Sequence, residues 1–503
     1  MSEPKKVDRR KFLEAGLAAI ALAGIGSAVY FATQPRGVIT KTITETAPAK
    51  TVTKTVPASP GAVVTETVTE TTTVTKTVSP TAAPLPAVTL NYLSETGPEP
   101  ELVAETFNWY KQAFPDSPIT FKPDICDRTV SRMKYMSMLA EKRNDYQLYW
   151  CWIQWTRWFV AHEAIEPLEN ILPSDILEKQ KANIPEMLLD FIVLDGKTYD
   201  LPIYWNSICL FYRKDLFEDP KEKEAFEKEY GYELRPPRTW KEWIDIAKFF
   251  TRPEENLWGT TINGKAWAFY YDEYIYSNWA KLDYVDIKNK KCYINNDYGV
   301  KLLETLAELA KISPPGWEEG DWFTFGDPMF AEGKLAMWMN WYYPWPMFQD
   351  PTKSKVAGKV GVAPVPTIDE TVRPNTTLSG GGVTVFRFAT DEQKRAARNY
   401  LIWLLSDHVQ TAMATTGLLF IPARVDIVQQ PAISNFLKAE PFLELVDKQD
   451  FAMNDLDTLN YEALWVDGST EALMKIVRGE MSAKEAADWY ADYIIRKLEE
   501  AGV

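Results

Sequence analysis

The chain has 503 residues and a mass of 57.5 kDa, which is long for one ordinary domain and leaves room for two lobes with separate cores. Its formal net charge of -15 makes the surface a poor match for nucleic acid or anionic lipid. Because the chain has only two histidines and no Cys-x-x-Cys pair, zinc sites and histidine-based triads are nearly excluded, and no metal or cofactor is expected.

The N-terminus has the pattern of an export signal. Residues 5–32 combine a charged start with about twenty mostly apolar residues. The pair Arg9 and Arg10, followed by Phe-Leu, resembles a twin-arginine signal, which exports proteins already folded. Residues 26–28 offer a cleavage site, but the apolar run continues beyond them to a bilayer-spanning length. Residues 1–36 are therefore predicted to be an export signal that stays as a membrane anchor.

The next segment, residues 37–87, changes abruptly to Thr, Val, Pro, Ala, Lys and Glu. Alternating Thr and Val have strand propensity, but repeated Pro and the lack of aromatic residues or an apolar face argue against a packed element. The segment is predicted to be a disordered stalk, and its Thr clusters beside Pro suit O-glycosylation.

The folded body begins near Val88 with alternating strand and helix patterns. Strands are predicted at residues 88–93, 119–122 and 146–150, and helices at residues 100–114 and 128–143. This alternation predicts an α/β fold with a parallel sheet whose strand C-termini face a ligand cleft.

Polar and aromatic residues follow these strands and are candidates for that cleft. Glu95 is predicted in the loop after the first strand, and Trp152 and Gln154 come just past the third. Packing of Trp152 and Trp155 over the next helix is an equally good interpretation.

Residues 196–217 form the stretch around which the body is organised. A Gly-Lys turn signal is followed by Leu-Pro-Ile, which Pro keeps out of a helix, and then by a strand at residues 208–212. The stretch resembles the first crossover between the lobes of the extracellular solute-binding proteins that feed ABC importers, in particular the sugar-binding group that includes maltose-binding protein. The resemblance makes Tyr204 and Asn206 ligand candidates, although the group has an acidic residue where this chain has Asn206.

Further motifs of the same group follow in order. Thr239 is predicted to cap a helix, with Glu242 completing a capping box, in a segment similar to the group's P-x-T-W-E-E. An aromatic and acidic block, residues 267–279, resembles a ligand-facing helix of maltose-binding protein. The candidates in that block are Asp272, Glu273, Tyr274 and Trp279.

The pattern F-x-x-G-x-x-A-M at residues 330–337 leads from a helix through a Gly C-cap into a strand. In the family, a ring stacked on sugar follows that strand. The resemblance therefore makes Asn340, Trp341 and Tyr343 candidates, without distinguishing which ring contacts the ligand.

Residues 360–366 and 378–383 resemble the return crossing between the lobes. The run of three glycines that includes Gly380 and Gly381 lowers the steric cost of unusual φ and lets backbone N–H groups approach a hinge or ligand. It lacks the spacing of a phosphate loop, so nucleotide binding is not expected. Near the C-terminus, Trp465 is a third stacking candidate, with a packing role as the alternative.

The four cysteines divide between the two predicted lobes. Cys126 and Cys151 fall in one lobe, and Cys209 and Cys292 in the other. Two disulfides within the lobes and four buried free thiols are both consistent with the sequence of an exported protein.

The resemblance implies a two-lobed periplasmic-binding-protein-like fold that closes by hinge motion. The lobes are expected at residues 88–203 plus 376–428 and at residues 204–375 plus 429–503. The expected function is capture of a mono- or oligosaccharide outside the cell for an ABC permease with its ATPase, without chemistry on the ligand. The alternatives are the same fold binding a peptide, a polyamine or another polar solute, and a secreted glycoside hydrolase. Anchor, stalk and body together resemble binding proteins of archaea that lack an outer membrane.

Overall fold

The computed structural model describes most of the body and four short strands before it. The described residues are 45–46, 50–58, 62–70, 73–74, 87–262, 264, 285–286, 289–416, 421–437, 440–446, 448, 450–452 and 468–500. Residues 24–85 form one compact unit, and residues 86–503 belong to another. The predicted export signal at residues 1–36 lies outside the described residues. No helix in the described part of the chain is long and apolar enough to cross a bilayer.

The smaller unit contains paired strands. β2 (Lys50–Ala58) pairs antiparallel with β3 (Ala62–Glu70), and β1 (Glu45–Thr46) pairs with β4 (Thr73–Val74). The alternation of Thr and Val accounts for this pairing, because β-branched residues favour strands. The role of the segment as a stalk stays a prediction.

The larger unit is built on a mixed sheet, which confirms the predicted α/β class. Its strand order is β13-β10-β15-β7-β5-β6, with β14 paired to β10 and β16 to β15. Within it, β5 pairs in parallel with both β6 and β7, as the alternating pattern predicts. The strands are β5 (Thr89–Glu95), β6 (Thr120–Cys126), β7 (Leu148–Trp152), β10 (Tyr204–Arg213), β13 (Met337–Trp341), β14 (Val360–Ala363), β15 (Asn375–Val385) and β16 (Asp450–Ala452). Short two-residue pairs join β8 (Val193–Leu194) to β9 (Lys197–Thr198) and β11 (Val285–Asp286) to β12 (Lys291–Cys292).

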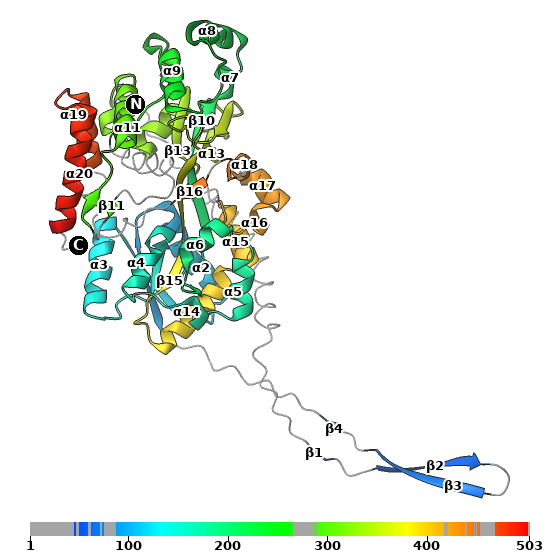
Figure 1. Cartoon of the computed structure of the whole chain (residues 1–503). Helices are drawn as coiled ribbons and strands as arrows, with labels where there is room; N and C mark the ends of the chain where they lie inside the picture. The colour runs from blue at the N-terminus through cyan, green and yellow to red at the C-terminus, as the bar shows by residue number, and fades with distance from the viewer. Residues whose placement is uncertain are drawn as a thin grey trace. The chain divides into compact units, whose positions relative to one another are not determined.

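The helices connect these strands and cover them. Figure 1 shows α8, α9 and α11 at one end of the larger unit and α2, α5 and α14 at the other, with β10 between them. In α2, the buried residues Leu102, Thr106 and Tyr110 recur every four positions and so share one face. The helices from α2 to α9 are α2 (Pro98–Ala113), α3 (Arg128–Ala140), α4 (Thr156–Ala161), α5 (Ser174–Lys181), α6 (Glu186–Ile192), α7 (Lys214–Phe217), α8 (Pro220–Tyr230) and α9 (Trp240–Phe250). Those that follow are α11 (Asp297–Lys311), α12 (Asp327–Ala331), α13 (Trp345–Phe348), α14 (Asp391–Leu404), α15 (Asp407–Ala414), α16 (Val425–Val428), α17 (Pro431–Leu437), α18 (Glu440–Val446), α19 (Gly468–Val477) and α20 (Ala483–Glu500).

Strand β10 exchanges partners along its length. Its residues 204–207 pair with β15, and its residues 208–212 pair with β13. Separate apolar clusters lie on the two sides of this exchange. One contains Leu93 and Tyr149, and the other contains Leu210, Trp243 and Leu306. The stretch predicted to cross between lobes therefore links two groups of strands with their own cores, while the lobe boundaries themselves stay predictions.

The prediction of an N-cap at α9 is confirmed, but that of a capping box is not. The backbone N–H of Glu242 donates to Thr239 Oγ1 at 3.2 Å, as expected of an N-cap. The Glu242 carboxylate, however, accepts from the N–H of Arg238 at 2.7 Å, one residue before the cap. The prediction of a full capping box is wrong, because Glu242 is also held by the Arg235 guanidinium at 2.7 Å.

The glycine run lies within β15 and has a different role from the one predicted. Among the described residues, its glycines are absent from those with positive φ, so unusual backbone angles do not explain them. A Cβ on Gly381 would lie 2.5 Å from Trp150 Cζ2, and one on Gly380 would lie 2.7 Å from the Tyr204 carbonyl oxygen. The glycines are needed because atoms of the neighbouring strands approach the β15 backbone too closely to leave room for a side chain.

We expect Gly381→Ala to lower the free energy of unfolding by about 1–3 kcal/mol, because the added methyl group overpacks the contact with Trp150. Urea unfolding followed by circular dichroism measures the loss. Gly97→Ala is the control, since its Cβ would meet no atom closer than 3.5 Å and should cost less than about 1 kcal/mol. Equal losses in the two variants would contradict the packing argument.

Candidate functional site

One side of the candidate site forms where the parallel strands β5 and β7 end. Glu95, predicted in a loop, is the last residue of β5 and is buried. Its carboxylate accepts hydrogen bonds from Trp152 Nε1 and from Arg128 Nε. The Arg128 guanidinium also lies 5.8 Å from the centre of the Trp155 ring. The structure thus brings together Glu95 and Trp152, two residues named from the sequence, and adds Arg128.

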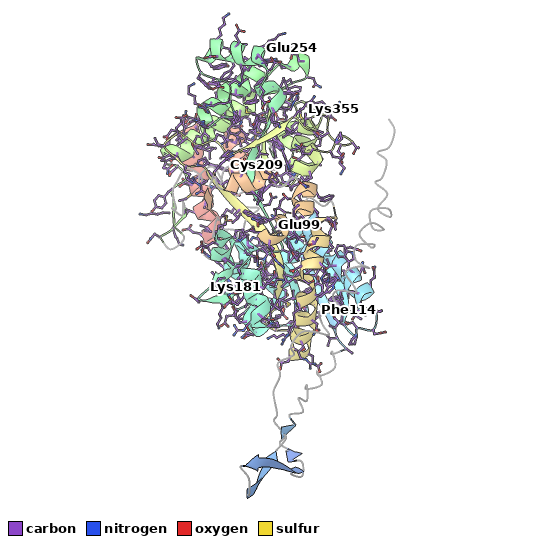
Figure 2. All side chains as sticks on the ribbon, turned by 90° about the vertical axis from the view of Figure 1, so that its right-hand side faces the viewer. Glu99, Phe114, Lys181, Cys209, Glu254 and Lys355 are labelled. Carbon is purple, nitrogen blue, oxygen red and sulfur yellow. The ribbon has the colours of Figure 1, made fainter. Side chains whose placement is uncertain are left out.

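Glu99 and Tyr204 extend this side of the site. Tyr204 is buried, and its ring centre lies 6.2 Å from the ring centres of both Trp150 and Trp152. Its hydroxyl group is hydrogen-bonded to the carboxyl group of Glu99. Burial raises the pKa of Glu99 to about 7, and the nearby charge of Glu95 adds to the rise. In the view of Figure 2, Glu99 lies below Cys209 and above Phe114.

Asn206 lies where β10 exchanges partners, and its side-chain oxygen is used by the backbone. Asn206 Oδ1 accepts from the N–H of Ser207 at 2.9 Å and from the N–H of Tyr342 at 3.0 Å. Tyr342 immediately follows β13, so one buried amide ties the crossing strand to the end of its neighbour. A contact between Asn206 and ligand stays a prediction.

The other side of the candidate site is centred on Asp327, at the start of α12. This buried carboxylate accepts from Trp338 Nε1 at 2.8 Å, from Asn340 Nδ2 at 2.9 Å and from the Tyr343 hydroxyl group. Burial raises the pKa of Asp327 to about 6, and its hydrogen bonds partly offset the rise. Asn340 and Tyr343 were named from the sequence, and Asp327 joins them into one cluster.

Two aromatic rings lie side by side at this cluster. The ring centre of half-buried Tyr343 is 5.2 Å from that of Phe323, a residue that is 55% exposed. Phe323 belongs to η5 (Trp322–Gly326), a single π-helical turn of a kind often found at functional sites. Trp341, by contrast, packs against the apolar cluster that contains Trp243. Of the two rings predicted here, Tyr343 is therefore the one beside an exposed aromatic surface.

The remaining sequence-based candidates fall into two groups. Gln154 is half-buried in η1 (Ile153–Trp155), and its Oε1 has no hydrogen-bond partner in the described part of the chain. Gly380 and Gly381 are buried within β15. The others lie outside the described residues: Asp272, Glu273, Tyr274, Trp279 and Trp465.

Sequence reasoning missed Glu99, Arg128, Phe323 and Asp327. Each lies in the first turn of a helix or in the π turn before one, where local patterns give no sign of ligand contact. The available signal was positional, because Glu99 and Arg128 follow strand ends, and Asp327 precedes the F-x-x-G motif by three residues.

The four cysteines are free thiols. Cys151 and Cys209 are buried, and burial raises the pKa of both thiols well above the ordinary value. Of the two alternatives that the sequence left open, the structure has free thiols and no disulfide within either predicted lobe.

A further buried acid, Asp200, lies beside Gly382 of the glycine run. Asp200 is fully buried just before β10, and a Cβ on Gly382 would lie 2.3 Å from its Oδ1. Burial raises the pKa of Asp200 to about 8, so the folded chain holds the carboxyl group protonated at neutral pH. The crossing region thus contains a neutral acid in contact with close-packed backbone.

The fold is similar to that of solved solute-binding proteins. The solute-binding protein of an ABC transporter from Agrobacterium radiobacter K84, in complex with ribitol, superposes with a TM-score of 0.65 at 22% identity, covering 82% of this chain and 100% of that one. The maltose-bound MalE3 of T. maritima gives a TM-score of 0.62 at 20% identity, covering 82% and 99%. These similarities establish the periplasmic-binding-protein fold.

The family follows from the sequence comparison. The model of the bacterial extracellular solute-binding protein family matches residues 129–441, which is more than half of the chain. The chain therefore belongs to the bacterial extracellular solute-binding proteins.

Two curated relatives match about half of the chain. The mannitol-binding protein of Pseudomonas aeruginosa is 22% identical over 267 residues, 51% of this chain and 56% of the relative. The sn-glycerol-3-phosphate-binding periplasmic protein UgpB of Brucella melitensis is 22% identical over 288 residues, 56% of this chain and 62% of the relative. The chain spans a little over half the length of these relatives.

We expect Asp200→Asn to weaken the dependence of folding stability on pH. Because burial raises the pKa of Asp200 above the unfolded value of about 3.9, its contribution to stability is fully present below that pH and is lost as the pH rises to about 8. Urea unfolding at about pH 5 and about pH 8 measures this slope for the wild-type chain and the variant. The exposed Asp190→Asn is the control and should keep the wild-type slope. An unchanged slope in Asp200→Asn would contradict the expected titration.

Proposed function

We propose that this chain is the extracellular substrate-binding subunit of an ABC importer and that its ligand is an uncharged sugar or polyol. The observation that carries the proposal is the pairing of aromatic rings with buried hydrogen-bonding groups in both clusters. Tyr343 lies beside the exposed ring of Phe323 and is bonded to Asp327, and Trp152 is bonded to Glu95. Rings cover the apolar faces of a sugar, while carboxylates and amides bond its hydroxyl groups.

The charges of the site favour an uncharged solute over an anion. The two clusters contain the carboxyl groups of Glu95, Glu99 and Asp327, and the guanidinium of Arg128 is engaged by Glu95. A phosphate group, such as that of glycerol 3-phosphate, would meet like charges here. A polyamine or a basic peptide is the competing ligand class, but the exposed ring of Phe323 is better explained by a sugar.

The family to which the chain belongs consists of binding proteins, so a glycoside hydrolase has no support from it. We infer that solute binds between the two clusters and that contacts to both sides favour a closed form. That form would dock on a membrane permease driven by separate ATPase subunits. In this proposal the N-terminal segment directs export by the twin-arginine route and stays as a membrane anchor of archaeal type. It holds the body outside the cell on the Thr-rich stalk.

Titration of tryptophan fluorescence tests the proposal. The purified chain is mixed with maltose, maltotriose, D-mannitol and ribitol, with glycerol 3-phosphate and spermidine for comparison. We expect a saturable change with a sugar or polyol, and Tyr343→Ala should raise Kd at least about tenfold because it removes a ring contact and the bond to Asp327.

Tyr298→Ala is the control, because Tyr298 is a partly exposed ring on α11, outside the two clusters. It should leave Kd unchanged. Saturable binding of spermidine or glycerol 3-phosphate without any response to the sugars would overturn the ligand assignment while leaving the family unchanged.

A further inference from the structure

We propose that Asp327 is a positioning residue of the solute site. It accepts hydrogen bonds from Tyr343 and Asn340, and in doing so it fixes the Tyr343 ring and leaves Asn340 Oδ1 as the acceptor offered to a solute hydroxyl group. The solute part of this proposal rests on the proposed function.

The chemistry of the carboxylate fixes the orientation of the Asn340 amide. An ionised carboxylate only accepts hydrogen bonds, so the amide group that faces Asp327 at 2.9 Å must be Nδ2. Oδ1 of Asn340 then points away from Asp327. Asn340 is fully buried, and its Oδ1 has no hydrogen-bond partner within the described residues. Buried acceptors are normally paired, so in this proposal Oδ1 accepts from a solute hydroxyl group once binding rearranges the groups that cover it.

Two donors on β13 and a close contact at Gly326 hold Asp327 in place. Trp338 and Asn340 alternate on the same face of β13, so both donors reach one oxygen of the carboxylate. A Cβ at position 326 would lie 2.2 Å from Trp338 Cζ2, so Gly326 is what lets the indole approach. The π turn η5 ends at Gly326, and Asp327 begins the next helix.

The third donor, Tyr343, connects Asp327 to the exposed ring of Phe323. The Tyr343 hydroxyl group donates to Asp327 Oδ2, and the Tyr343 ring packs against exposed Phe323. Loss of the carboxylate would therefore remove one hydrogen bond from a half-buried ring, whereas Trp338 is fully buried and is held by packing as well. This difference predicts that removing Asp327 disturbs Tyr343 more than it disturbs the core.

Fluorine NMR of the solute-free chain, with 3-fluorotyrosine at position 343, tests positioning directly. The groups that act on Asp327 are Tyr343, Trp338, Asn340 and the charge of Asp321. We expect the resonance to shift with pH, with a midpoint near pH 6, because burial raises the pKa of Asp327 to about 6. The shift should disappear in Asp327→Asn and persist in Asp321→Asn. A resonance indifferent to pH and to Asp327→Asn would overturn the proposal.

A double-mutant cycle on Kd for maltose and D-mannitol tests the solute role. We expect Asp327→Ala to raise Kd about 10- to 100-fold and Asp327→Asn to raise it less, since the amide oxygen still accepts one bond. Tyr343→Phe should raise Kd in the wild-type chain but have no further effect in Asp327→Ala. Independent effects of the two changes would mean that Asp327 does not act through Tyr343.

Two controls separate positioning from folding. Asp297→Asn removes an exposed acid from the first turn of α11, as Asp327 occupies the first turn of α12, and should change neither Kd nor the fluorine spectrum. Thermal unfolding establishes that each variant is folded. If the folded wild-type chain binds neither probe nor any other sugar or polyol, the proposed function and the role of Asn340 Oδ1 both fail. The fluorine measurement still decides whether Asp327 positions Tyr343.

Discussion

The exchange of partners along β10 is the constraint on which the rest of the body depends. Four residues of this strand bond to β15 and the next five to β13, so one segment of backbone belongs to two sets of strands. Asn206 stabilises the exchange by accepting from two backbone N–H groups on either side of it. Each set of strands has its own apolar cluster, as the prediction of two lobes requires.

Buried acids have different roles in this structure, and their partners distinguish them. Glu95 and Asp327 accept hydrogen bonds from ring N–H, amide or guanidinium donors, which offset part of the cost of burial. Neither carboxylate oxygen of Asp200 has such a donor in the described part of the chain, and burial raises its pKa to about 8, so that acid is neutral within close-packed backbone. Acids held by several side-chain donors are suited to orienting other groups, whereas Asp200 serves packing at the crossing.

The order of elements could be predicted because it depends on local patterns. Alternating apolar runs and turn signals gave the strands that became β5, β7 and β10, and the expected parallel edge brought Glu95 to Trp152. Asp327 could not be predicted in this way, since its role arises from donors 11 to 16 residues along the chain that fold back onto it. The glycine run was located correctly but misinterpreted, because close approach of Trp150 is a tertiary contact with no local signal.

Hydrogen bonds to Glu95 and Asp327 hold side chains of both clusters in fixed orientations, and this bears on how the proposed binding would use its energy. Side chains already fixed by Glu95 and Asp327 lose little conformational entropy on contact with a ligand. In the proposed function, the cost that remains is movement of one predicted lobe relative to the other around β10 and β15. A solute that touches only one cluster cannot offset that cost, whereas one that bridges the two can. Selectivity would then depend on whether a solute reaches from Trp152 to Tyr343 as well as on the bonds made at either end.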